Sequence, residues 1–172
     1  MEYVGSFNAV KAGKAYIVEA ENFAPNNKIM TFHVDSGASV TLLGLNSFCR
    51  RDKVQEYELL KKIIKEEIQQ GGFAAVANSG STVTEEEIEM YPCKYDGVSI
   101  MGSKPITLYF HIFLGNIGMP LLGFDYIDGT SYHHSINGDL VFNAVAEDVG
   151  KMHYPKKVID FNKVLNKFNS QK

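Results

Sequence analysis

Short apolar runs separated by turn-forming residues dominate the hydrophobic pattern of this chain. Lys11-Ala12-Gly13-Lys14 lies between two such runs and predicts a hairpin, and Ala24-Pro25-Asn26-Asn27 breaks the chain before a third run. Later, Asp96-Gly97 and Gly102-Ser103-Lys104-Pro105 predict turns of an antiparallel meander. The pattern therefore indicates a mainly antiparallel β domain. We expect its strands over residues 3–10, 15–21, 28–34, 98–101 and 106–114, with a late hairpin over residues 135–142.

Two segments change to helical spacing. The first has apolar residues every three or four positions and predicts a long amphipathic helix over about residues 46 to 70, ended by Gly71-Gly72. The second follows Pro155 and predicts a C-terminal helix with Asp160 near its start, where the helix dipole favours an acid. The apolar residues of the two patterns are Val54, Tyr57, Leu60, Ile64 and Ile68, and Val158, Phe161, Leu165 and Phe168.

Composition narrows the class of protein. The chain has 172 residues, which is most simply one domain with a sizeable core. Its formal net charge of -3 offers no basic footprint for nucleic acid. The start of the chain has no secretory signal pattern, and no window approaches the length of a membrane span. We therefore expect a cytoplasmic protein with no nucleic-acid or membrane partner, and leave open whether it is a fragment of a longer protein.

The metal-ligating residue types form no site pattern. Cys49 and Cys93 are isolated thiols without metal-type spacing, which suits a reducing compartment, and a disulfide between them is the less favoured alternative. His133, His134 and His153 lack a companion Cys or carboxylate at ligand spacing. We therefore expect ordinary loop histidines, no metal site and no cofactor.

The most informative segment is Asp35-Ser36-Gly37-Ala38-Ser39, which lies between two strand-like runs. Gly37 supplies backbone freedom on a tight turn, and the Ser36 hydroxyl can bond neighbouring backbone or a facing chain. The turn would hold the Asp35 carboxylate rigidly. The plainer alternative is an ordinary turn in which Asp, Ser and Gly serve local geometry.

A second segment favours chemistry at this turn. Pro120-Leu121-Leu122-Gly123 follows a strand-like run and precedes a short helical pattern, 85 residues after Asp35. With the Asp-Ser-Gly turn, it gives the chain a resemblance to the retropepsin-like aspartic protease family, over about residues 5 to 145. The resemblance implies a closed β-barrel of acid-protease type, with Asp35 catalytic and Ser36, Gly37 and Ala38 forming the active-site turn. It also implies that Leu121, Leu122 and Gly123 support that turn from beneath.

The resemblance also implies a flap, a hairpin that closes over the substrate. It would occupy about residues 73 to 90, with Ala77, Asn78, Ser79, Gly80 and Ser81 contacting the substrate. The small residues of this segment allow a backbone to approach a ligand closely, and glycine allows the tip to flex. The alternative is a plain surface hairpin.

Assembly follows from the number of catalytic turns. Peptide hydrolysis by carboxylates needs an acid and a base together. Two carboxyl groups about 3 Å apart meet this need, because they cannot both be ionised at once and therefore share one proton. The chain has one Asp-Ser-Gly turn, since Asp128-Gly129-Thr130 places its glycine before the hydroxyl residue. The second Asp35 must then come from another copy in a two-fold dimer.

Glu85-Glu86-Glu87-Ile88-Glu89 offers a different hydrolase chemistry. On a strand, Glu85, Glu87 and Glu89 would share one face without a basic or aromatic partner in the segment, so a charged exposed strand is the favoured interpretation.

The sequence therefore predicts a mainly β, retropepsin-like barrel over residues 1–145 and a helical tail over 146–172. We expect a homodimeric aspartic endopeptidase acting on peptide or protein substrates. The main alternative is a non-catalytic dimerisation or peptide-binding module with the same fold.

Overall fold

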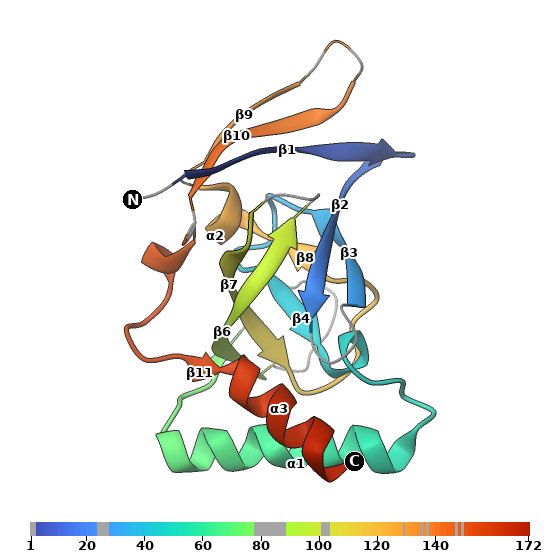
Figure 1. The fold of residues 1–172 in the computed structure, drawn as a ribbon, viewed down its shortest axis with the longest axis vertical. Coiled ribbons are helices and arrows are strands. Elements are labelled where there is room, and N and C mark those ends of the chain that lie inside the picture. Colours follow the sequence, from blue (N-terminus) through green and yellow to red (C-terminus); the bar gives the residue numbers. More distant parts are fainter. Residues whose placement is uncertain are drawn as a thin grey trace.

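The computed structural model describes residues 3–23, 28–77, 89–100, 104–128, 130–134, 136, 138–146, 148 and 150–172. Within these residues, eleven strands and three α-helices are arranged as shown in Figure 1. The strands are β1 (Tyr3–Ala12), β2 (Ala15–Phe23), β3 (Lys28–Val34), β4 (Leu42–Gly44), β5 (Val76–Ala77), β6 (Glu89–Ile100), β7 (Ile106–Phe113), β8 (Leu121–Leu122), β9 (Ser131–His134), β10 (Leu140–Ala146) and β11 (Ile159–Asp160). The helices are α1 (Val54–Gly71), α2 (Phe124–Ile127) and α3 (Phe161–Gln171), with 3₁₀ turns η1 (Leu45–Ser47) and η2 (Lys151–His153).

Six strands close into a barrel in the order β2, β3, β8, β4, β7 and β6. The last strand pairs back with the first through Ala20 opposite Ile100 and Glu21 opposite Ser99, which closes the ring. This confirms the predicted mainly β, closed-barrel fold. Outside the ring, β1 pairs with both β2 and β10, and β10 pairs with β9 (Figure 1). The late hairpin is therefore present, although its strands begin at Ser131 rather than near residue 135.

The expected turn at Asp96-Gly97 is wrong. These residues lie inside the twelve-residue strand β6, where the pairing with β7 shifts register between Asp96 and Val98. Gly97 has a φ of +91°, which favours glycine and lets the strand bulge without ending. The Thr107 hydroxyl donates to Asp96 Oδ1 across the pair at 2.7 Å, so the polar residues at this position stabilise the sheet.

The long helix is present but begins at Val54, eight residues later than predicted. Residues before it hydrogen-bond elsewhere. The Leu45 N–H donates to the Gly115 carbonyl at 2.8 Å, and the Asn46 side chain forms hydrogen bonds with the backbone N–H and carbonyl of Ile117. These bonds hold η1 against the loop at residues 115–117, so the helix cannot extend back through it. At the other end Gly72 has a φ of +67° and caps the helix, as Gly71-Gly72 predicted.

The C-terminal helix is also present, and Asp160 caps it by accepting hydrogen bonds from the backbone N–H groups of Asn162 and Lys163. Val158 lies outside this helix, contrary to the predicted pattern. The reason is β11, in which Ile159 pairs with Cys93 of β6 and delays the helix start. Sequence periodicity could not reveal this pairing, because it depends on a strand more than sixty residues away.

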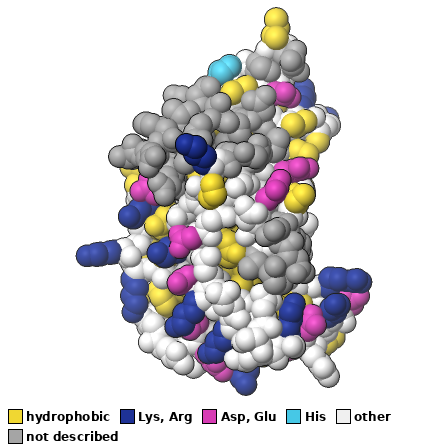
Figure 2. Space-filling view, viewed as in Figure 1, with side chains coloured by type: hydrophobic (Ala, Val, Ile, Leu, Met, Phe, Trp, Pro, Cys, Tyr) yellow, Lys and Arg dark blue, Asp and Glu magenta, His cyan; other side chains and the backbone are white. Residues whose placement is uncertain are grey.

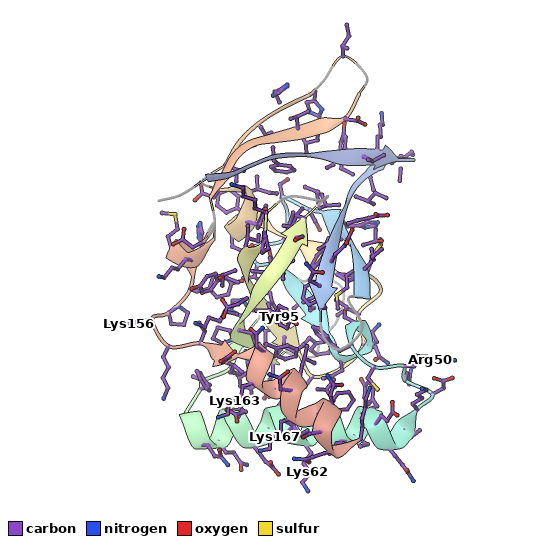
Figure 3. All side chains as sticks on the ribbon, viewed as in Figure 1. Arg50, Lys62, Tyr95, Lys156, Lys163 and Lys167 are labelled. Atoms are coloured by element: carbon purple, nitrogen blue, oxygen red, sulfur yellow. The ribbon has the colours of Figure 1, made fainter. Side chains whose placement is uncertain are left out.

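Helices α1 and α3 pack against each other below the barrel (Figures 1 and 3). Lys163 and Lys167 on α3 lie near Glu67 and Glu66 on α1, with N–O distances of 3.2 and 3.7 Å. The Phe161 ring reaches the core, with its centroid 4.8 Å from that of Phe48. The tail therefore contributes to the main hydrophobic core. Side chains of both charge signs cover this end of the molecule (Figure 2).

Cys49 and Cys93 are both buried, and no disulfide joins them. Within the described residues, no helix is long and apolar enough to cross a membrane.

Candidate active site

Asp35 lies on the turn directly after β3, with its side chain exposed. Its Oδ1 accepts a hydrogen bond from the Gly37 N–H at 2.9 Å, and its backbone carbonyl accepts one from the Ala38 N–H at 3.2 Å. Its own N–H donates to the Leu122 carbonyl at 2.9 Å. Ser36 and Gly37 are exposed and Ala38 is half-buried. Backbone bonds thus fix the turn while the second carboxylate oxygen, Oδ2, makes no hydrogen bond within the described part of the chain.

The segment with Leu121, Leu122 and Gly123 lies directly beneath this turn. Strand β8 runs between β3 and β4, parallel to the former and antiparallel to the latter. Leu122 is buried and Leu121 is half-buried. A Cβ atom on Gly123 would lie 2.3 Å from the Val40 carbonyl oxygen and 2.9 Å from the Ala38 carbonyl oxygen. Only glycine allows this approach, after which the Phe124 N–H donates to the Ala38 carbonyl at 2.8 Å.

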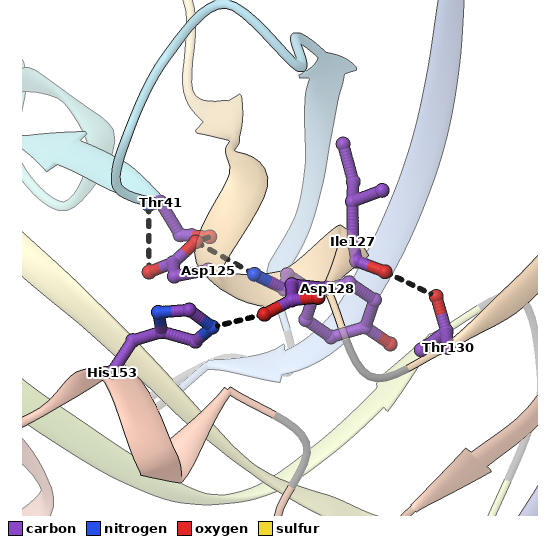
Figure 4. A network of polar contacts seen from close by, with 7 residues as sticks. Thr41, Asp125, Ile127, Asp128, Thr130 and His153 are labelled. Atoms are coloured by element: carbon purple, nitrogen blue, oxygen red, sulfur yellow. Dashed lines mark hydrogen bonds and ion pairs between the residues drawn. The ribbon is translucent and has the colours of Figure 1, made fainter.

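A buried carboxyl group, Asp125, connects the two segments (Figure 4). It is 1% exposed, at the first turn of α2. Its Oδ2 accepts from the Thr41 N–H at 2.9 Å, and its Oδ1 accepts from the Thr41 hydroxyl at 2.7 Å and from the Tyr126 N–H at 2.8 Å. The Thr41 hydroxyl in turn accepts from the Gly123 N–H at 3.2 Å. The network satisfies polar groups that would otherwise be costly to bury.

Sequence reasoning missed Thr41 and Asp125. A signal for the second was available, because Asp125 is the one charged residue among the apolar residues Phe124, Tyr126 and Ile127. A charged residue in such a segment needs hydrogen-bond donors nearby. Which donors it meets depends on the tertiary structure.

Residues after β10 also reach this network. The Tyr154 hydroxyl donates to Asp125 Oδ2 at 2.5 Å, and burial together with the nearby Asp125 raises the pKa of Tyr154 well above its usual value. His153 Nε2 lies 2.9 Å from Asp128 Oδ2 (Figure 4). Asp128 approaches His153 from a different part of the chain, so the pair could not be found from ligand spacing in the sequence.

A pocket of about 210 Å³ opens beside the Asp35 turn. One wall is formed by residues around that turn and the other by the β9–β10 hairpin. The Tyr16 hydroxyl lies at its rim, 3.2 Å from His134 Nδ1. The mostly apolar lining suits apolar side chains of a ligand. The pocket is lined by Tyr16, Val34, Ser36, Ile127, Tyr132, His134, Leu140 and Phe142.

The structure describes only some of the remaining predicted site residues. Ala77 lies in β5 and pairs with Glu89 of β6. Asn78, Ser79, Gly80 and Ser81 lie outside the described residues, as do the glutamates 85–87. Glu89 accepts a hydrogen bond from the Tyr91 hydroxyl at 3.1 Å.

The histidine pair differs from its prediction. His133 and His134 lie in strand β9 rather than in a loop, opposite Val141 and Leu140 of β10. Neighbouring strand residues point to opposite faces of a sheet, so these two imidazoles do not converge. The described part of the chain contains no group of three or more His, Cys, Asp or Glu side chains arranged to hold a metal ion.

A likeness of this chain to known proteins lies among solved structures. No protein-family model and no curated protein matches the sequence. Among solved structures, a retropepsin-like aspartic protease from Rickettsia conorii aligns with 85% of this chain and 98% of its own chain, at 19% sequence identity and a TM-score of 0.44.

Proposed function

We propose that this protein is an aspartic endopeptidase that acts as a homodimer. The observation that carries the proposal is the Asp35 turn itself: an exposed carboxyl group on a backbone-bonded turn, supported from beneath by the close approach of Gly123. A turn that served only to reverse the chain would not need a glycine placed against its carbonyl groups. The arrangement suits a carboxyl group that must be held in one position.

The second carboxyl group of the site would be Asp35 of another copy. Two other acids, Asp125 and Asp128, already have partners. Asp125 is buried in its hydrogen-bond network, and Asp128 lies against His153. The sheet also ends at β9, whose outer side has no neighbouring strand within the described residues. This open edge borders the same pocket as Ser36. In the proposed dimer a second copy pairs at this edge, and its Asp35 completes the site.

In the proposed reaction, the two Asp35 carboxyl groups share one proton. The ionised group takes a proton from water, and the protonated group donates a hydrogen bond to the scissile carbonyl and later supplies a proton to the leaving nitrogen. Ser36, Gly37 and Ala38 hold the turn, and Leu121, Leu122 and Gly123 support it. Residues 77–81 would close over an extended peptide whose apolar side chains enter the pocket beside Ser36. The shared proton polarises the carbonyl, so the reaction as proposed requires no cofactor.

Replacing Asp35 by Asn tests this proposal. Asn keeps the shape and hydrogen-bonding capacity of Asp but cannot ionise or share a proton, so cleavage of a diverse peptide mixture should fall by several orders of magnitude. The variant should stay folded and dimeric, because Asn can still accept the Gly37 bond and the close carboxyl pair is removed. Cleavage, thermal midpoint and sedimentation are measured on one preparation.

Asp52→Asn is the matched control, because Asp52 is an exposed acid that pairs with Arg50 and belongs neither to the Asp35 turn nor to its support. It should cleave at the parent rate. An Asp35→Asn protein that is folded and cleaves like the parent would show that Asp35 is a structural residue only. A parent protein that binds peptides without cleaving them at any pH would favour the non-catalytic binding module.

A further inference from the structure

The Asp125 carboxyl group accepts four hydrogen bonds, and one of them comes from a distant part of the chain. Three of the donors belong to Thr41, which closely follows the Asp35 turn, and to Tyr126, which closely follows the supporting segment at Gly123. The fourth is the Tyr154 hydroxyl, which belongs to the segment between η2 and β11. Among the described donors to Asp125, Tyr154 is the one that connects the tail to the candidate site.

Four bonds use the acceptor capacity of a carboxylate, which has about four lone-pair sites. Tyr154 and the Thr41 N–H both donate to Oδ2, at 2.5 and 2.9 Å. At 1% exposure, Asp125 has little access to bulk water that could replace a lost donor. Removing the Tyr154 hydroxyl would therefore leave one side of Oδ2 unsatisfied and allow the carboxyl group to rotate.

A short chain of bonds leads from Asp125 to Asp35. Asp125 holds both the N–H and the hydroxyl of Thr41, and that hydroxyl accepts the Gly123 N–H. The chain on either side of Gly123 then bonds the turn directly, through Phe124 N–H to the Ala38 carbonyl and Asp35 N–H to the Leu122 carbonyl. A rotation of Asp125 would thus loosen both bonds that hold the turn on its support.

Tyr154 is itself held in place from several directions. The Tyr109 and His111 rings of β7 lie with centroids 5.4 and 4.9 Å from its ring. Before it, Gly150 has a φ of +91°, and a Cβ there would lie 3.2 Å from the Asp125 carbonyl oxygen. His153 lies against Asp128. Residues 150–154 therefore contact the start and the end of α2 together, and the hydroxyl is directed at one oxygen.

We propose that Tyr154 is a positioning residue for the catalytic turn, acting through Asp125 to keep Asp35 in its reactive orientation. The proposal rests on the proposed function. It assigns to the segment after β10 a direct part in the site, in addition to its contribution to the core.

Tyr154→Phe is the test, because it removes the hydroxyl and keeps the ring. The variant should lose roughly tenfold in kcat with KM unchanged, since a small misplacement of a reacting group affects the chemical step rather than peptide binding. Tyr109→Phe is the matched control: its ring lies beside that of Tyr154, but its hydroxyl makes no hydrogen bond with the described residues. This control should keep the parent kcat and KM.

A second measurement does not depend on activity. In the unsubstituted protein, proton NMR should show a slowly exchanging Tyr154 hydroxyl proton close to the Thr41 amide. In Tyr154→Phe, the amide protons of Thr41 and Gly123 should exchange with solvent at least several times faster, while amides of α1 keep the parent rates.

The outcomes separate the two proposals. A parent protein without cleavage overturns the proposed function, and the exchange rates then decide alone whether Tyr154 holds the turn. Parent exchange rates at Thr41 and Gly123 in Tyr154→Phe would overturn the positioning role. So would a parent kcat, or a loss of kcat that matches only the fraction of protein unfolded.

Discussion

At the scale of single residues, His111 is a buried group whose pKa is altered by its surroundings. It is 4% exposed on β7, and its Nδ1 makes no hydrogen bond within the described residues. Its backbone N–H donates to the Thr41 carbonyl at 2.8 Å, which places the ring beside the Asp125 network. Burial lowers the pKa of His111 from 6.5 to about 4. The neutral imidazole can pack against Tyr154, whereas the charged form would lose its hydration.

This pKa shift predicts a loss of stability in mild acid. Below pH 6.5 the unfolded chain binds a proton at His111 that the folded protein does not, so the free energy of unfolding falls as the pH falls towards about 4. The contribution is at most about 3 kcal/mol across that range. His111→Leu should remove this part of the pH dependence, measured by urea unfolding between pH 7 and pH 4. A variant whose stability declines with acid as steeply as the parent would contradict the assignment.

At the scale of elements, the two-residue strand β8 has an effect out of proportion to its length. It lies between β3 and β4, and its neighbour Gly123 packs against the Val40 carbonyl without room for a side chain. The barrel order and the position of Asp35 both depend on this passage. Helices α1 and α3 lie at the end of the molecule away from the β9–β10 hairpin and contribute to the core (Figure 1).

Gly123→Ala should therefore be strongly destabilising. The added methyl group would lie 2.3 Å from a backbone oxygen, which cannot move aside as a side chain could. We expect a loss of about 3 kcal/mol or more in the free energy of unfolding, and a thermal midpoint lower by roughly 10 °C. Gly118→Ala is the control, because a Cβ there meets no atom within 4 Å. Equal thermal midpoints for the two variants would show that the segment can shift at little cost.

At the scale of the whole molecule, the proposed dimer rests on two features: the exposed Asp35, and the edge of β9, which has no neighbouring strand within the described residues. Tyr132 on β9 is 57% exposed, and Ile136 in the following turn is fully exposed. Large apolar side chains at an unpaired edge favour association. Each chain supplies one of the two carboxyl groups that the proposed reaction needs.

Cleavage activity should accordingly depend on concentration. Because each chain supplies one Asp35, the activity per mole should fall when the protein is diluted through the range in which dimers dissociate. Activity and sedimentation are measured over the same dilution series, and peptide substrate should slow the loss by binding across the dimer. Constant activity per mole in samples that sediment as monomers would rule out a shared site.

The sequence by itself determined the features that depend on near neighbours. Helical spacing identified α1 and α3, Asp160 marked a helix start, and the Asp-Ser-Gly order identified a rigid acidic turn. These features follow from local geometry, which depends on residues that are close together in the sequence.

Only the tertiary structure decided where distant residues meet. Asp96-Gly97 is a turn signal by composition, but pairing with β7 makes it a bulge in a continuous strand. Likewise, η1 is held by the loop at residues 115–117, and the two bury polar groups together. Asp125 acquires its donors from Thr41 and Tyr154, whose positions no local pattern relates. The physical reason is the same in each case: burial makes an unpaired polar group costly, and its partner can come from any part of the chain that the fold brings near.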